Sequence, residues 1–122
     1  MQSRITGNTL IVAGPRNFFD REVIIDNLIN AICKVKPTKI ITGNATGVDQ
    51  ITAEYCHGLT EIEFEVFPAN WDKYGRSAGP RRNYFMAMQA THLIAFTNGS
   101  PGTSNMIYFA KRHDLEIILV NI

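Results

Sequence analysis

The amino-acid sequence predicts a three-layer α/β domain in which a five-stranded parallel sheet lies between about four helices. Five short apolar runs mostly lack polar alternation, which favours strands that are covered on both faces. Helical patterns separate these runs, and such alternation indicates a parallel sheet with helices on both sides. Five strands, four helices and eight connections of average length need about 115 residues. The 122 residues therefore predict one domain over residues 1–122.

The five apolar runs are rich in Ile, Val and Phe, and each has the length of a short strand. Glu61, Glu63 and Glu65 alternate along the third run, which predicts the solvated face of an edge strand. The runs cover residues 10–13, 39–42, 62–67, 93–96 and 117–120.

The first two helical patterns carry recognisable start and stop signals. The first begins after Asp20, a favoured N-cap residue type, and ends before Pro37. The second begins at Val48 and is closed by Gly58, a residue type common just past a helix end. Both signals predict helices between successive strands.

The other two helices are predicted over residues 80–90 and 103–113, with Pro80 near the first turn of the earlier one. The connection over residues 68–79 is predicted to be irregular. A connection of this length in so small a domain is more often functional than idle.

Composition excludes several classes of protein. With 45% hydrophobic and 19% charged residues, the chain has the make-up of a globular domain. Two cysteines without metal-ligand spacing predict neither a disulfide framework nor a metal site, and we expect no cofactor. The N-terminal apolar stretch is too short for a signal segment or membrane span, so we expect a cytoplasmic protein. A net charge of +1 without an obvious basic stripe counts against nucleic acid as a partner.

Three glycine-containing loops follow the first, second and fourth strands. Ligands of open parallel sheets bind at the carboxyl ends of strands, where glycines let the backbone approach and helix N-termini offer N–H groups. Any one of these loops is equally well explained as a turn, but three at one edge favour a phosphate cradle. None is a complete nucleotide motif, so the ligand stays open. The candidate ligand contacts in these loops are Gly14, Arg16, Gly43, Asn44, Thr46, Gly47, Asp49, Asn98, Gly99, Gly102 and Thr103.

Further candidates lie outside these loops. Arg81 and Arg82 at the start of the third helix oppose its dipole, and a bound anion would relieve this. In the alternative, one arginine is solvated and the other pairs with a carboxylate. Trp71 either stacks on a base or fills an apolar gap. Asp49 either holds a ribose hydroxyl or only favours the helix dipole.

Together these motifs resemble the YspA-like group of the SLOG superfamily over about residues 10–121. This group comprises Rossmann-like nucleotide-binding domains related to the LOG cytokinin-activating enzymes and to the DNA-processing protein DprA. The resemblance implies a nucleotide-type ligand with its phosphate at residues 99–103 and its sugar near residues 43–49, in a homodimer. The segments that carry it are Gly14-x-Arg16, Thr42-Gly43-x-x-x-Gly47-x-Asp49, Pro68-Ala69-x-Trp71, Ala78-Gly79-Pro80-x-Arg82-Asn83-x-x-Met86 and Gly99-x-x-Gly102-Thr103.

The sequence departs from the LOG pattern at an essential position. LOG enzymes hydrolyse the N-glycosidic bond of nucleoside monophosphates with an arginine four residues before a methionine, which Arg82 and Met86 match. They also use a glutamate three residues after the Gly-Thr threonine, where this chain has Met106. A methionine supplies no carboxylate to stabilise an oxocarbenium-like transition state. Asn44 and Thr46 also replace a glycine and an arginine that are usual in the group.

Three functions follow in order of preference. The missing glutamate favours a non-catalytic module that senses or sequesters a small nucleotide. The alternative is a phosphoribohydrolase-like N-glycosidase in which Arg82 is catalytic and Asp49 or Asp72 replaces the missing carboxylate. A binder of single-stranded nucleic acid is a third alternative, disfavoured by the near-neutral charge.

Overall fold

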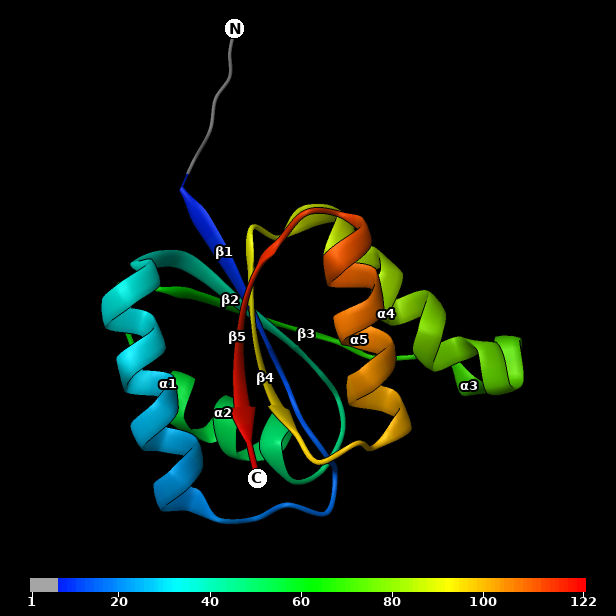
Figure 1. The fold of residues 1–122 in the computed structure, drawn as a ribbon, viewed down its shortest axis with the longest axis horizontal. Coiled ribbons are helices and arrows are strands. Elements are labelled where there is room, and N and C mark those ends of the chain that lie inside the picture. The colour runs from blue at the N-terminus through cyan, green and yellow to red at the C-terminus, as the bar shows by residue number, and fades with distance from the viewer. Residues whose placement is uncertain (1–6) are drawn as a thin grey trace, which may run out of the picture.

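A computed structural model describes residues 7–122 and shows one five-stranded sheet in the order β3-β2-β1-β4-β5 (Figure 1). All four pairs of neighbouring strands are parallel, which confirms the α/β class. The strands are β1 (Asn8–Ala13), β2 (Pro37–Gly43), β3 (Glu63–Phe67), β4 (His92–Thr97) and β5 (Glu116–Asn121).

Four long helices cover the two faces of the sheet, as predicted. Leu10 and Val12 of β1 lie in one core cluster with residues of α1 and α2, whereas Ile11 and Ala13 lie in a second cluster with residues of α4 and α5. Both sides of β1 are therefore buried, which explains its unbroken apolar run. The helices are α1 (Arg21–Val35), α2 (Val48–Cys56), α4 (Ala78–Gln89) and α5 (Pro101–Arg112).

Local signals account for the bounds of α1 and for the edge position of β3. The Asp20 side chain accepts a hydrogen bond of 3.2 Å from the Val23 N–H, as an N-cap does. Lys36 closes the helix in a left-handed conformation with φ 52°. On β3, Glu63 and Glu65 are exposed and pair with Lys39 of the neighbouring strand, so the predicted solvated edge is confirmed.

The connection predicted to be irregular over residues 68–79 is instead mostly helical. It contains α3 (Trp71–Tyr74) and a 3-10 turn, η1 (Gly75–Ser77), before α4 begins at Ala78. The Asn70 side chain caps α3 by accepting 3.1 Å from the Lys73 N–H. Both α4 and α5 begin two residues before their predicted starts. Pro80 is tolerated inside α4 because the first N–H groups of a helix have no intrahelical acceptor.

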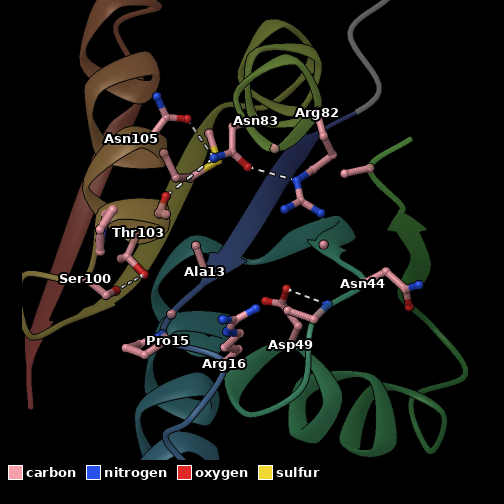
Figure 2. A pocket seen from close by; sticks show the side chains of 18 of the residues that line it. Ala13, Pro15, Arg16, Asn44, Asp49, Arg82, Asn83, Ser100, Thr103 and Asn105 are labelled. Carbon is pink, nitrogen blue, oxygen red and sulfur yellow. Dashed lines mark hydrogen bonds between the residues drawn. The ribbon is translucent and has the colours of Figure 1, made fainter. Parts of the chain in front are cut away.

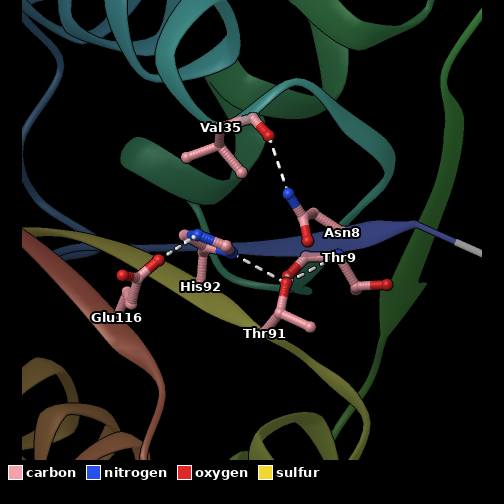
Figure 3. Close-up of polar contacts among 6 residues, drawn as sticks. All are labelled: Asn8, Thr9, Val35, Thr91, His92 and Glu116. Carbon is pink, nitrogen blue, oxygen red and sulfur yellow. Dashed lines mark hydrogen bonds and ion pairs between the residues drawn. The ribbon is translucent and has the colours of Figure 1, made fainter. Parts of the chain in front are cut away.

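The amino ends of the central strands are joined by polar contacts (Figure 3). The Thr9 N–H donates to the Thr91 hydroxyl at 3.0 Å, and that hydroxyl lies 2.7 Å from His92 Nδ1. His92 Nε2 lies 2.7 Å from Glu116 Oε2. These contacts tie together the amino ends of β1, β4 and β5. None of the helices in residues 7–122 is long and apolar enough to span a membrane.

At the opposite edge of the sheet, where the strands have their carboxyl ends, β1 and β4 are neighbours whose following loops go to opposite faces. This place is the topological switch point of the sheet. The chain leaves β1 toward α1 on one face and leaves β4 toward α5 on the other (Figure 1). Neighbouring loops that diverge in this way leave a crevice where open α/β sheets bind ligands.

Candidate ligand-binding cleft

A cleft of about 900 Å³ lies at this carboxyl edge (Figure 2). Its walls come from the loops after β1 and β2, from α3, and from the first turns of α4 and α5. Its volume falls in the range of about 300–1,000 Å³ that is typical of sites for small ligands. Segments far apart in the sequence therefore meet at one concave site.

The loops after β1 and β2 are fastened to each other. The Thr46 hydroxyl donates to the Arg16 carbonyl oxygen at 2.7 Å, and the Val48 N–H donates to the Pro15 carbonyl oxygen at 3.4 Å. Between them Gly47 has φ +69°, and a Cβ there would lie 2.6 Å from the backbone of both Pro15 and Arg16. Gly47 therefore shapes the cleft by allowing this close approach, although it lies outside the lining.

Asp49 is the buried carboxylate of the cleft, with 7% of its surface exposed. Its Oδ1 lies 2.8 Å from the Thr42 hydroxyl, and its Oδ2 accepts 3.2 Å from the Ala45 N–H. Burial raises the pKa of Asp49 to about 6, although those two hydrogen bonds and the charge of Arg82 lower it. Asp49 thus holds the β2–α2 loop from inside and titrates near neutral pH.

Arg82 lines the cleft and projects into it from α4 (Figure 2). Its Nη1 donates to the Phe67 carbonyl oxygen at 3.0 Å, and its Nε donates to Asn83 Oδ1 at 2.9 Å. Burial lowers the pKa of Arg82, while the charge of Asp49 raises it. A Cβ on Gly43 would lie 2.5 Å from Arg82 Nη1 and 2.9 Å from Asp49 Oδ2. A glycine at position 43 therefore leaves room for this charged pair.

Arg81 points elsewhere. Both arginines were predicted in the first turn of this helix, but α4 begins at Ala78, so Arg81 is its fourth residue and Arg82 its fifth. The Arg81 Nε donates to the Ser77 hydroxyl at 3.0 Å, and its guanidinium lies 4.3 Å from the ring centroid of Tyr74. Arg81 lies outside the cleft lining. Arg81 is therefore exposed, whereas Arg82 lies close enough to Asp49 for the two charges to influence each other.

An amide pair joins α4 to α5 at the back of the cleft. Asn83 Nδ2 donates to Asn105 Oδ1 at 2.9 Å and to the Gly102 carbonyl oxygen at 3.4 Å. Because Asn83 also accepts from Arg82, the position of that guanidinium is linked to the start of α5. No motif or spacing in the sequence marks Asn105 as a cleft residue. Its only signal is a polar residue shortly after Thr103, and spacing alone does not show which way it faces.

The loop after β4 contributes fewer residues to the cleft lining than its two glycines predict. Asn98 and Gly99 lie outside the lining, where the Asn98 side chain accepts 3.2 Å from the Ser100 N–H and Gly99 has φ +89°. They form the turn that leads into α5. Gly102 and Thr103 line the cleft, and the Ser100 hydroxyl donates to Thr103 Oγ1 at 3.2 Å.

Trp71 stands at the rim of the cleft on α3 with 59% of its surface exposed. A Cβ added to Gly79 would lie 3.2 Å from Trp71 Cη2, so the indole ring passes close over α4. Arg76 of η1 also lines the cleft and was missed, because residues 68–79 were expected to be irregular. Asp72 lies outside the lining.

The charges of the lining favour an anion. Arg16, Arg76 and Arg82 stand against Asp49, the one carboxylate that lines the cleft in the described chain, which leaves a formal balance of +2 when Asp49 is ionised. Within residues 7–122 no group of three or more His, Cys, Asp and Glu is placed to hold a metal ion. Of the residues predicted to contact a ligand, the cleft is lined by Gly14, Arg16, Gly43, Asn44, Thr46, Asp49, Trp71, Arg82, Asn83, Gly102 and Thr103.

The fold and the cleft define a Rossmann-like α/β protein with a cleft at the carboxyl ends of its parallel strands. Residues 9–74 match the model of the YspA, cpYpsA-related SLOG family, and this match covers more than half of the chain. The chain belongs to that family. A search of curated proteins found no match. The matched stretch runs from β1 to α3, so it includes Arg16, Asp49 and Trp71 but ends before Arg82.

Proposed function

We propose that the cleft binds a small nucleotide or nucleotide-derived ligand without transforming it, so that the protein senses or sequesters that ligand. The observation that carries this proposal is the excess of guanidinium groups over carboxylates in a cleft at the switch point of the sheet. Guanidinium groups suit bidentate contact with phosphate. The proposed phosphate position is near Gly102 and Thr103, where the first N–H groups of α5 have no intrahelical acceptor.

The absence of a suitable carboxylate supports binding over hydrolysis. Glycosidic bond cleavage needs carboxylates to protonate the leaving group or stabilise the transition state. In the described chain Asp49 is the one carboxylate of the lining, and each of its oxygens already contacts a protein group. Met106 lines the cleft at the position where LOG enzymes carry a glutamate.

One observation favours the N-glycosidase alternative. The pKa of Asp49, raised to about 6, leaves part of this carboxyl protonated near neutral pH, as a general acid requires. This alternative is tested by incubating the protein with nucleoside monophosphates and measuring free base by chromatography. Base release that Asp49→Asn abolishes would establish the enzyme, whereas intact substrate at high protein concentration would exclude it.

Thermal unfolding with a nucleotide panel tests the proposed binding. Nucleoside mono- and diphosphates and ADP-ribose-like compounds are added separately, and a ligand at a hundred times its Kd stabilises by about 2.7 kcal/mol. Arg82→Ala and Arg16→Ala should reduce the rise in melting temperature, because each removes a cation from the lining. Lys34→Ala, on the exposed part of α1, is the matched control. No rise with any compound of the panel would overturn the proposal.

A further inference from the structure

The outward face of α4 and α5 exposes large apolar side chains. Tyr84, Phe85, Met88 and Tyr108, here called the α4–α5 face, are between 41% and 57% exposed. The two helices lie side by side over the sheet (Figure 1) and bury their opposite sides in the core. Single exposed apolar residues are ordinary, but a contiguous group marks a site of interaction.

Ring contacts connect the three aromatic members of this group through Phe109. The Tyr84 ring centroid lies 6.1 Å from that of Phe85 and 5.6 Å from that of Phe109 on α5. The Tyr108 centroid lies 5.3 Å from that of Phe109. These rings therefore form one cluster across both helices. They meet edge to face, which is a favourable geometry for aromatic pairs.

The charged residues of α4 and α5 themselves are all cations. Although the net charge of the chain is only +1, the segment from Lys73 to His113 contains no carboxylate. Because both helices follow parallel strands, their N-termini lie together at the carboxyl edge of the sheet. Arg81 thus flanks the face near the cleft, and Lys111 and Arg112 flank it at the other end. The cations of the segment are Lys73, Arg76, Arg81, Arg82, Lys111 and Arg112.

We propose that the α4–α5 face docks a protein partner through an amphipathic helix whose apolar stripe is flanked by carboxylates. Aromatic residues, Met and Arg are enriched at the centres of protein interfaces, which have polar rims, and this face has that composition. A second copy presenting the same face would set cations against cations. The homodimer implied by the family resemblance is therefore expected to form elsewhere. None of Tyr84, Phe85, Met88 and Tyr108 lines the cleft, so this docking is separate from nucleotide binding.

Fluorescence anisotropy with synthetic peptides tests this docking on the whole chain. The probe is a helical peptide with leucines at helical spacing and glutamates near both ends, and its matched form has lysines in place of the glutamates. The acidic peptide should bind at least about tenfold more tightly than the basic one, a difference of about 1.4 kcal/mol. Arg112→Glu should remove most of this preference, while Lys34→Glu at the end of α1 should leave it unchanged.

Comparing two equally exposed phenylalanines distinguishes specific docking from nonspecific hydrophobic binding. Phe85 and Phe19 are 57% and 58% exposed, so neither change to Ala should lower the melting temperature much. Phe85→Ala should weaken the acidic peptide about tenfold, or about 1.4 kcal/mol, and Phe19→Ala should not. Equal effects of the two variants, or equal binding of both peptides, would refute the proposal. So would a dimer that Phe85→Ala dissociates, or an oligothymidine that displaces the peptide and requires Phe85.

Discussion

The Thr42 hydroxyl oxygen lies 2.8 Å from Asp49 Oδ1 and also 2.8 Å from the Val12 carbonyl oxygen. A hydroxyl has one hydrogen and can donate to only one of these oxygens at a time. When it donates to Val12, its contact with Asp49 is a hydrogen bond only if the carboxyl carries a proton and donates it to Thr42. Burial favours the protonated acid at this position, whereas donation from the Thr42 hydroxyl and the Ala45 N–H favours the carboxylate, and burial has the larger effect.

This proton makes stability depend on pH in a defined direction. The pKa of Asp49 is raised from 3.8 to about 6 in the folded protein, which corresponds to about 3 kcal/mol. Well below pH 3.8 both the folded and the unfolded states are protonated. Between pH 3.8 and about 6 the unfolded chain is mostly ionised while the folded protein keeps its proton, so the free energy of unfolding attributable to Asp49 falls across this range and levels off above pH 6. Urea denaturation between pH 4 and 7.5 measures this fall.

Asp49→Asn is the variant that isolates this contribution. The amide does not titrate, so the difference in unfolding free energy between variant and wild type should grow in favour of the variant by up to about 3 kcal/mol over that pH range. Asp26→Asn, an exposed position on α1, controls for general charge effects. A pH-independent difference for Asp49→Asn would show that the carboxyl is ionised throughout.

The packing of Gly43 against Arg82 predicts how adding a single methyl group at position 43 changes stability and nucleotide binding. In Gly43→Ala the new Cβ would lie 2.5 Å from Arg82 Nη1, so the guanidinium must move off its contact with the Phe67 carbonyl. We expect a loss of about 1–3 kcal/mol of stability and a smaller nucleotide-induced rise in melting temperature. In the control Gly58→Ala, the Cβ meets nothing nearer than 3.6 Å. Similar behaviour of the two variants would contradict this account.

The sequence predicts the fold more completely than it predicts the lining of the candidate site. Short apolar runs indicate the strands and Asp20 indicates the start of α1. Both features can be recognised in the sequence because each depends only on neighbouring residues. The start of α4 was misplaced because Pro80 is compatible with several positions in a first turn. Asn105 and Arg76 were missed since their place in the cleft depends on how α5 and η1 pack, which no spacing in the sequence records.

The pair Asn83 and Asn105 is expected to act as a unit. Asn83→Ala leaves Arg82 Nε and the Asn105 amide without their partner in a half-buried setting, which costs about 1–3 kcal/mol. Asn105→Ala should cost less, because Asn83 keeps its contacts with Arg82 and Gly102. A double-mutant cycle by urea denaturation should give a coupling of about 0.5 kcal/mol or more. Strict additivity would mean that the amides do not interact in solution.

Trp71 gives the cleft its own optical reporter, because the chain contains one tryptophan and it stands at the rim, 59% exposed. A nucleotide that stacks on the indole should change its emission and shield it from acrylamide. The Kd from this titration should agree with the Kd obtained from the concentration dependence of the thermal stabilisation. Gly79→Ala should shift the emission before any ligand is added, since its Cβ would lie 3.2 Å from Trp71 Cη2. Ligand-induced stabilisation with unchanged emission and quenching would show instead that Trp71 only packs over α4 and takes no part in recognising the base.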